Sequence, residues 1–385
     1  MKKEFSPVAF LGAIGAGGIA VAPFAFLQYV VYNGKGLVKY ASLHSGDLAI
    51  QTKIFYGILE SIMLGFASLH ILLSILLFSR FVRWVKRGFH DILVQDPIQN
   101  SALLLPFVSL FMTMNVFIGV IRYFVPSLAD NLQLFMGPAL GTWIVLLIVL
   151  LLYQVRLMRK SFVKSFDTSK IHFGFLMQPF ALAMATVTGT GIAALSNNLT
   201  IAHTAAFFSI VSGSLSLFLL VLKTGVIFFN HYKSNGLPEK QNMPAILSVI
   251  PVLTLLAISG FRIGHYLEHA FGMHMQSFIF FVVVSAFAVQ TWYLLFGMSI
   301  LKDYLRKDFV KNEFYFSQWG LVCPFVAYGV LGSFMYKVFV PSPILMVIIL
   351  GTLIVAIGIH LTILKRHTEQ CFIGTSSVAP VTVAA

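Results

Sequence analysis

The sequence predicts an all-α integral membrane protein with ten transmembrane helices, arranged as five helical hairpins. Of the 385 residues, 58% are hydrophobic and only 10% are charged, whereas soluble domains carry about 25% charged residues. The chain also contains ten apolar runs close to the roughly 20 residues that a helix needs to cross a bilayer. These runs are apolar on all sides, whereas the strands of a membrane barrel would alternate with a period of two.

The ten runs cover residues 8–32, 55–79, 103–124, 134–154, 173–195, 203–229, 244–261, 275–301, 316–336 and 344–364. Taken in pairs they give hairpins over 8–79, 103–154, 173–229, 244–301 and 316–364, so residues 1–370 are expected to form a single transmembrane domain. The first run is too long for the apolar part of a signal peptide and is expected to be an uncleaved helix. The small, neutral residues 371–385 predict a disordered tail.

The distribution of positive charge predicts the topology. Of the 26 Lys and Arg residues, 19 fall at the ends or loops on the side of the two termini, six fall on the opposite side, and Lys223 lies within a run. Positively charged loops stay in the cytoplasm. Both termini are therefore expected in the cytoplasm, with the chain in a bacterial-type inner (plasma) membrane.

Prolines mark an internal repeat. One central proline lies in each odd-numbered run, at successive spacings of 83, 73, 72 and 73 residues, and the even-numbered runs have no central proline. Proline kinks a helix because it lacks an N–H. The period predicts a quasi-fivefold ring, with the kinked odd helices inside, the even helices outside and a path along its axis. The kink prolines are Pro23, Pro106, Pro179, Pro251 and Pro324.

The residues next to these prolines are candidates for a pore lining and gate. If the kinks share one level, the neighbouring residues encircle the axis in a mostly apolar ring, which can close a pore sterically or by dewetting. Four of the prolines are followed by phenylalanine. The pore and gate candidates are Phe24, Phe107, Phe180, Phe325, Gln178 and Cys323.

Two ionisable residues within apolar runs are candidates for function. Glu60 is interpreted as a charged rim residue that could pair with Lys53, with a coupling-proton site as the alternative. Lys223 either extends its ammonium group toward the interface or attracts anions to an inner vestibule.

No metal, cofactor, enzyme activity or nucleic-acid partner is expected. The string His265, Glu268, His269 and His274 resembles a set of metal ligands but falls in a predicted outside loop, where a solvated or pH-sensitive mouth is the better interpretation. His70, His203 and His360 are single histidines on predicted outer helices, whereas a haem bundle needs facing pairs. No phosphate-binding loop of the GxxxxGK[ST] type is present, which disfavours an ATP-driven pump.

The ten-helix frame resembles a known family, the TehA/slow-type anion channels, also called tellurite-resistance/dicarboxylate transporters. The similarity is carried by four segments: FSPVAFLGAIGAGGIAVAPF, DPIQNSALLLPFVSLF, KTGVIFFNHYKSNGLPEKQNMPAILSVIPVL and FSQWGLVCPFVAYG. The resemblance implies a homotrimer with one anion pore in each subunit. It also implies a gate phenylalanine in the ninth helix, at the position that the Trp319–Pro324 register assigns to Cys323. With cysteine there, Phe325, Phe107 or Phe180 would have to act as the gate.

These observations predict a passive anion channel, or a channel-like transporter, for small inorganic or organic anions in the lipid bilayer. The first alternative is a proton-coupled exporter of oxyanions or C4-dicarboxylates, which needs a titrating residue on the path, and Glu60 is its candidate. A remote alternative is a membrane redox subunit that binds haem or quinone.

Overall fold

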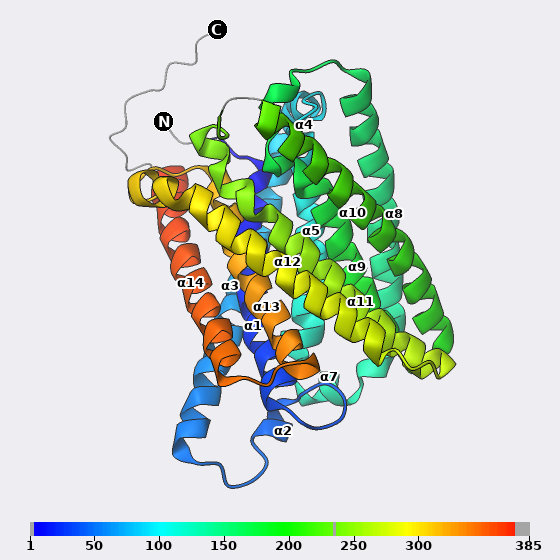
Figure 1. The fold of residues 1–385 in the computed structure, drawn as a ribbon. Coiled ribbons are helices and arrows are strands. Elements are labelled where there is room, and N and C mark those ends of the chain that lie inside the picture. The colour runs from blue at the N-terminus through cyan, green and yellow to red at the C-terminus, as the bar shows by residue number, and fades with distance from the viewer. Residues whose placement is uncertain (1–3, 234–235, 374–385) are drawn as a thin grey trace.

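Every regular element of the described residues is helical. The computed structural model describes residues 4–233 and 236–373. Ten helical spans are long and apolar enough to cross a membrane, which confirms the predicted number and the multi-pass character of the protein (Figure 1). The spans are Pro7–Val31, Ile50–Lys86, Asn100–Phe124, Leu132–Val163, Phe173–Leu195, Leu199–Lys233, Lys240–Phe271, Gln276–Asp308, Phe316–Val338 and Pro343–Cys371.

The odd-numbered spans contain five buried α-helices: α1 (Phe10–Phe26), α5 (Leu105–Val116), α9 (Met177–Leu195), α11 (Val249–Phe271) and α13 (Val322–Val338). A 3-10 segment precedes each of them, at Pro7–Ala9, Asn100–Leu104, Phe173–Leu176, Lys240–Ser248 and Phe316–Leu321. π-helical turns extend α1 over Leu27–Val31 and α5 over Phe117–Ile121. The inner spans are therefore irregular at their ends.

The even-numbered spans contain five long helices: α3 (Ile50–Lys86), α8 (Leu132–Val163), α10 (Leu199–Lys233), α12 (Gln276–Asp303) and α14 (Pro343–Thr368). Short helices lie in the connections: α2 (Tyr40–Leu43), α4 (Phe89–Val94), α6 (Arg122–Phe124) and α7 (Pro126–Asp130). The inner helices start at the face of the molecule that carries α4, here called the α4 face, while α2 and α7 lie at the opposite end, here called the α2 face (Figure 1).

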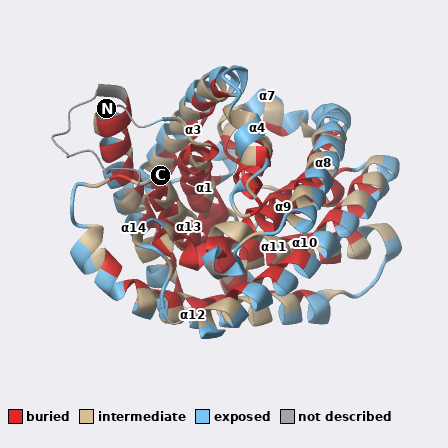
Figure 2. Cartoon of the chain, turned by 90° about the horizontal axis from the view of Figure 1, so that it is seen from above, coloured by how far each residue is buried: buried red, intermediate tan, exposed pale blue. Residues whose placement is uncertain are grey.

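Burial separates the two sets of helices. In the most apolar stretch of each span, 56–94% of the residues are buried in the odd spans and only 22–39% in the even spans. Figure 2 shows buried residues concentrated in the inner helices and exposed residues on the outer sides of α8 and α12. Apolar side chains on the outside of the even spans face lipid, since a surface of this composition would not be stable in water.

The five inner helices contact one another in a closed sequence. α1 packs against α5 and α13, α9 packs against α5 and α11, and α11 also packs against α13. Among the outer helices, α3 packs mainly on α1, α10 on α9, α12 on α11 and α14 on α13. α8 contacts α9 more than α5, so the second predicted hairpin is the least paired of the five.

The kink prolines do not share one level, in contrast to the sequence-based expectation. Pro106, Pro179, Pro251 and Pro324 are the second or third residue of their α-helices, directly after the 3-10 segments. Pro23 instead lies near the end of α1, about three turns further along. Proline is well tolerated in the first turn of an α-helix, where its missing N–H breaks no hydrogen bond within that helix and affects only a carbonyl of the segment before it. The four prolines therefore mark where a 3-10 segment becomes an α-helix.

Two predicted boundaries and one assignment of charged residues were wrong. α11 continues ten residues beyond position 261, so His265, Glu268 and His269 lie on a helix and not in a loop. Residues 371–373 belong to the π-helical segment Glu369–Ile373 and are not part of a tail, while residues 374–385 lie outside the described residues. The third error concerns charge: Arg122 and Arg262 were counted as loop residues, but Arg122 is buried and Arg262 is a half-buried residue of the cavity wall described below.

Close approach between helices depends on glycine at several positions. Gly189 of α9 lies directly against Trp143 of α8 and Ser209 of α10, and a Cβ at this position would overlap both side chains. Trp143 is fully buried and its Nε1 donates a hydrogen bond to the carbonyl of Ala185, 2.8 Å away. Gly189 therefore sets the distance at which α8 and α10 pack on α9.

Gly189→Ala is expected to lower the melting temperature of the purified protein, because overpacking a core of this kind costs about 1–3 kcal/mol. Gly225→Ala in α10 is the matched control, because a Cβ at Gly225 meets no atom within 4 Å. Thermal unfolding in detergent measures both variants. Equal melting temperatures for the two variants would contradict the packing described for Gly189.

Candidate functional site: a cavity enclosed by the inner helices

The five inner helices enclose a cavity of about 1080 Å³. Each of the five contributes residues to the wall, together with the segment after α1 and the start of α12. The cavity reaches solvent at the α2 face, where its lining includes the exposed residues Gly34, Gly36, Gln276 and Lys337. Two hydrogen bonds hold the chain at this mouth: Gln28 Nε2 donates to the carbonyl of Gly36 (3.1 Å), and the backbone N–H of Val38 donates to Gln28 Oε1 (2.7 Å).

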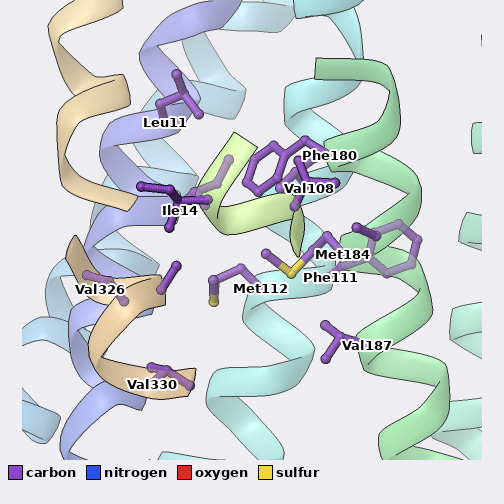
Figure 3. Close-up of a cluster of buried hydrophobic side chains, with 14 of the residues drawn as sticks. Leu11, Ile14, Val108, Phe111, Met112, Phe180, Met184, Val187, Val326 and Val330 are labelled. Carbon is purple, nitrogen blue, oxygen red and sulfur yellow. The ribbon is translucent and has the colours of Figure 1, made fainter. Parts of the chain in front are cut away.

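The other end of the cavity is apolar and closed. At this end, each inner helix contributes the lining residue that lies nearest to its start. These residues are Ile14, Met112, Phe180, Pro251 and Cys323. Beyond it, on the side of the helix starts, lie the buried side chains of Leu11 and Val108, as Figure 3 shows. The Phe180 ring lies next to Val108, opposite Leu11 and Ile14 (Figure 3). These apolar side chains separate the cavity from the α4 face, and they are called the apolar closure below.

One arginine carries charge into the cavity wall. Arg262 of α11 lines the cavity, and its Nη1 donates a 2.6 Å hydrogen bond to the carbonyl of Val187 on α9. The guanidinium lies over Gly191, where a Cβ would come within 3.2 Å of Nη1. This one carbonyl contact leaves the charge of Arg262 without a carboxylate partner among the described residues. A guanidinium presents several donors in a rigid fork and keeps its charge in proteins. The cavity therefore contains a fixed positive group.

Neutral polar groups lie deeper than Arg262. Asn115 of α5 donates from Nδ2 to Thr188 Oγ1 of α9 at 2.8 Å, and both residues line the cavity. Thr254 of α11 lines it as well and donates to Gln290 Oε1 of α12 at 2.7 Å. Between the apolar closure and Arg262, the described lining residues include no carboxylate. The carboxylate of Glu268 lies closer to the mouth, next to His265 Nδ1 at 3.0 Å.

The predicted pore and gate residues divide into two groups. Phe24, Phe180 and Cys323 line the cavity. Phe325 instead lines a separate small pocket, between α13 and α14, and Phe107 lies on the side of α5 that faces Tyr153 of α8, with 6.2 Å between ring centroids. Gln178 is buried and is not among the described residues of the cavity wall. Only the first group is placed to contact a molecule in the cavity.

Glu60 is part of a hydrogen-bonded cluster outside the cavity lining. Its Oε1 lies 2.8 Å from His44 Nε2 and accepts a hydrogen bond of 2.5 Å from the hydroxyl of Tyr123. These partners replace the Lys53 that the sequence suggested. The cluster joins the segment with α2 to α3 and α6, and nearby Arg122 donates to the carbonyl of Val38 at 2.6 Å. Glu60 therefore fastens the connection at the α2 face.

Lys223 of α10 compensates for a proline. In an α-helix, the residue at position 179 would donate its N–H to the carbonyl of residue 175, but Pro179 has none. Lys223 Nζ instead donates to the Phe175 carbonyl at 3.1 Å and lies 3.4 Å from the centroid of the Phe175 ring. The residue is 5% exposed, so its ammonium is held at this contact. Lys223 does not line the cavity.

The single histidines of the outer helices make hydrogen bonds to the inner helices. His70 of α3 donates from Nδ1 to the carbonyl of Ala13 (2.8 Å), and His360 of α14 donates from Nε2 to the carbonyl of Gly12 (3.0 Å). His203 of α10 bonds the hydroxyl of Tyr266 at 2.6 Å. These contacts tie α3 and α14 to α1, and α10 to α11. The described residues contain no group of three potential metal ligands.

Arg262 and Asn115 were missed as site residues by the sequence reasoning. Arg262 lies one residue beyond the predicted end of the seventh run. A usable signal is present in the sequence: Pro251, Thr254, Ile258, Arg262 and His265 recur every three or four residues, and all of them line the cavity. When residues at helical spacing change from apolar to polar along one face of a buried helix, that face is expected to line a cavity.

Comparison with models of known protein families finds no match, and comparison with curated proteins finds no significant match. The fold and the cavity nevertheless define a class. Ten apolar spans around a central cavity are the construction of a multi-pass membrane protein of the channel or transporter class.

The role of Lys223 predicts a specific coupling with Pro179. Lys223→Met is expected to destabilise the protein by about 0.5–3 kcal/mol more in the native background than in the Pro179→Ala background. In the latter background, the new N–H at position 179 supplies the hydrogen bond to Phe175. The four variants form a double-mutant cycle, measured as unfolding free energies in mixed micelles. An identical cost of Lys223→Met in both backgrounds would refute the compensation.

Proposed function

We propose that the protein is a passive anion channel, or a channel-like anion transporter, with one pathway through each subunit. The observation that carries this proposal is Arg262, a fixed positive charge in the wall of a cavity whose deeper described lining holds no carboxylate. Fixed charge of one sign, surrounded by low-dielectric walls, raises the local concentration of ions of the opposite sign. Between Glu268 and the apolar closure, the described lining offers no carboxylate to a cation.

The proposed path runs from the mouth at the α2 face to the apolar closure. Anions collect near Arg262 and exchange part of their hydration shell for the Asn115 amide and the Thr188 and Thr254 hydroxyls. The apolar closure, with Phe180 as its largest side chain, then blocks passage until its side chains move. Phe180 is preferred to Cys323 as the gate because its ring occupies the closure, whereas the thiol is small.

The proposal includes a ring of five hairpins, a trimeric assembly and an orientation in the membrane. Contacts of each inner helix with two others support a quasi-fivefold ring of hairpins, with the proline-containing helices inside and the even helices outside. The resemblance to the TehA/slow-type anion channels supports a homotrimer. Moving Arg122 and Arg262 into the protein leaves fewer positive loop residues at the α2 face. This strengthens the proposed orientation, with the α4 face and both termini in the cytoplasm of an inner (plasma) membrane.

A second candidate is a proton-coupled exporter of oxyanions or C4-dicarboxylates. It is favoured by the one-sided opening of the cavity, since transporters that work by alternating access expose their site to one face at a time. The placement of Glu60 weighs against its predicted role in such a mechanism, because its carboxylate is engaged with Tyr123 and His44 away from the cavity lining. A coupled exporter would need another titrating group, such as His265 or Glu268 at the mouth.

The flux test compares two phenylalanines. Phe180→Ala is expected to raise nitrate and chloride flux severalfold in proteoliposomes held at a potassium diffusion potential without a proton gradient, because it opens the apolar closure. Phe325→Ala, which removes the same side chain outside the cavity, is expected to leave the flux at the wild-type level.

Three results would count against the channel proposal. Flux that appears only with a proton gradient would favour the coupled exporter. Equal effects of the two alanine variants would refute Phe180 as the gate. The absence of anion flux under all conditions, with both variants folded, would refute anion passage altogether.

A further inference from the structure

The cavity is much larger than a small inorganic anion requires. Its volume of about 1080 Å³ compares with about 300–1,000 Å³ for sites that hold small organic molecules and about 30 Å³ for one water molecule. An inorganic ion at Arg262 would leave most of this space to water. The dimensions suit an organic ligand that brings an apolar body along with its charge.

An aromatic wall stands beside Arg262. Tyr29 of the π-helical turn after α1, Phe261 of α11 and Phe334 of α13 all line the cavity and contact one another. The centroid of the Tyr29 ring lies 4.0 Å from that of Phe334 and 5.8 Å from that of Phe261, and the two phenylalanine centroids are 4.9 Å apart. Aromatic faces and edges of this kind favour contact with another ring.

Aliphatic side chains complete the apolar surface. Val187 and Met184 of α9 lie on one side of the cavity, and Val326 and Val330 of α13 lie on the other (Figure 3). The same Val187 supplies the carbonyl that holds Arg262 in position. The positive group and the apolar walls are therefore parts of one site.

The charge pattern favours a single negative charge on the ligand. Among the described lining residues, no Lys or Arg other than Arg262 lies between the apolar closure and the level of Arg262. Glu268 follows six residues later on the same helix, about 9 Å further toward the mouth at 1.5 Å per residue. A second carboxylate on an extended ligand would approach Glu268 and be repelled.

We propose that the cavity binds an aromatic monocarboxylate, with its carboxylate on the Arg262 guanidinium and its ring against Tyr29, Phe261 and Phe334. The guanidinium fork matches the two oxygens of a carboxylate. This inference deepens the proposed function and rests on it only in that an anion enters from the α2 face. It names the class of organic anion that the site prefers over chloride and nitrate.

Benzoate is the probe for this site. Full-length protein in nanodiscs of zwitterionic lipid is expected to bind radiolabelled benzoate saturably in equilibrium dialysis, after subtraction of binding to empty nanodiscs. Arg262→Gln is expected to weaken binding about 10–100-fold, because hydrogen bonds to charged groups contribute about 1.5–3 kcal/mol. Arg262→Lys, which keeps the charge but loses the fork, is expected to fall between the two. Lys53→Gln removes an exposed charge outside the cavity lining and is expected to bind as wild type.

A neutral and an inorganic competitor test the aromatic wall and Arg262 separately. Benzyl alcohol keeps the ring without the charge, and chloride keeps the charge without the ring. Both are expected to displace benzoate at least about tenfold less well than unlabelled benzoate does. Benzoate binding that is unchanged in Arg262→Gln, or chloride that competes as well as unlabelled benzoate, would overturn the proposal.

The same preparations separate this inference from the proposed function. Nitrate flux without specific benzoate binding overturns the aromatic monocarboxylate site and leaves the anion pathway standing. Benzoate binding that depends on Arg262, without flux of any anion, supports the site and overturns the channel.

Discussion

The structure depends on hydrogen bonds that side chains of the outer helices donate to backbone carbonyls of the inner spans. A bilayer offers no water to satisfy these groups. Each of the five outer helices supplies at least one such donor. The donor and acceptor pairs are His70 to Ala13, Trp143 to Ala185, Lys223 to Phe175, Tyr293 to Ile246 and His360 to Gly12. Two of the acceptors, Phe175 and Ile246, lie in the 3-10 segments that start the inner spans. This support makes irregular backbone tolerable at membrane depth.

The support from outside leaves the inner faces free for another purpose. Small residues let the inner helices approach their neighbours closely, as at Gly12, which lies against the Trp319 ring. The residues that face the cavity add only a few links between inner helices, such as Arg262 to Val187 and Asn115 to Thr188. They can form an apolar closure at one end and present Arg262 and Asn115 between this closure and the mouth at the α2 face. The cavity and the buried hydrogen bonds are thus two consequences of one division between inner and outer helices.

Much of this arrangement was predictable from the sequence, because hydropathy and proline spacing report on it directly. Ten apolar runs gave the ten spans, and the prolines of the odd runs gave the inner set. The levels of these prolines were not predictable, since a 3-10 segment such as Phe173–Leu176 is as apolar as the helix that follows it. The equivalence of Pro23 with the other four prolines was wrong for the same reason.

The site itself was predicted only in part. Phe180 and Cys323 were named as pore candidates because they lie next to kink prolines. Arg262 was missed because hydropathy ends a span at a charge, and it does not distinguish an arginine at the membrane surface from one that lines a cavity. The positions of Phe107 and Phe325 were unpredictable too, since residues next to equivalent prolines face the cavity or an outer helix according to small rotations of each helix.

The central claim is that the cavity is a positively charged vestibule, open at the α2 face and closed toward the α4 face. Charged thiol reagents test it most directly, on a Val330→Cys variant in which Cys323 and Cys371 are replaced by serine, because Val330 lines the cavity. The account predicts modification from the α2 face, with an anionic methanethiosulfonate reacting on the order of tenfold faster than a cationic one, and loss of this preference in Arg262→Gln. Equal rates for the two reagents, or modification only from the α4 face, would contradict it.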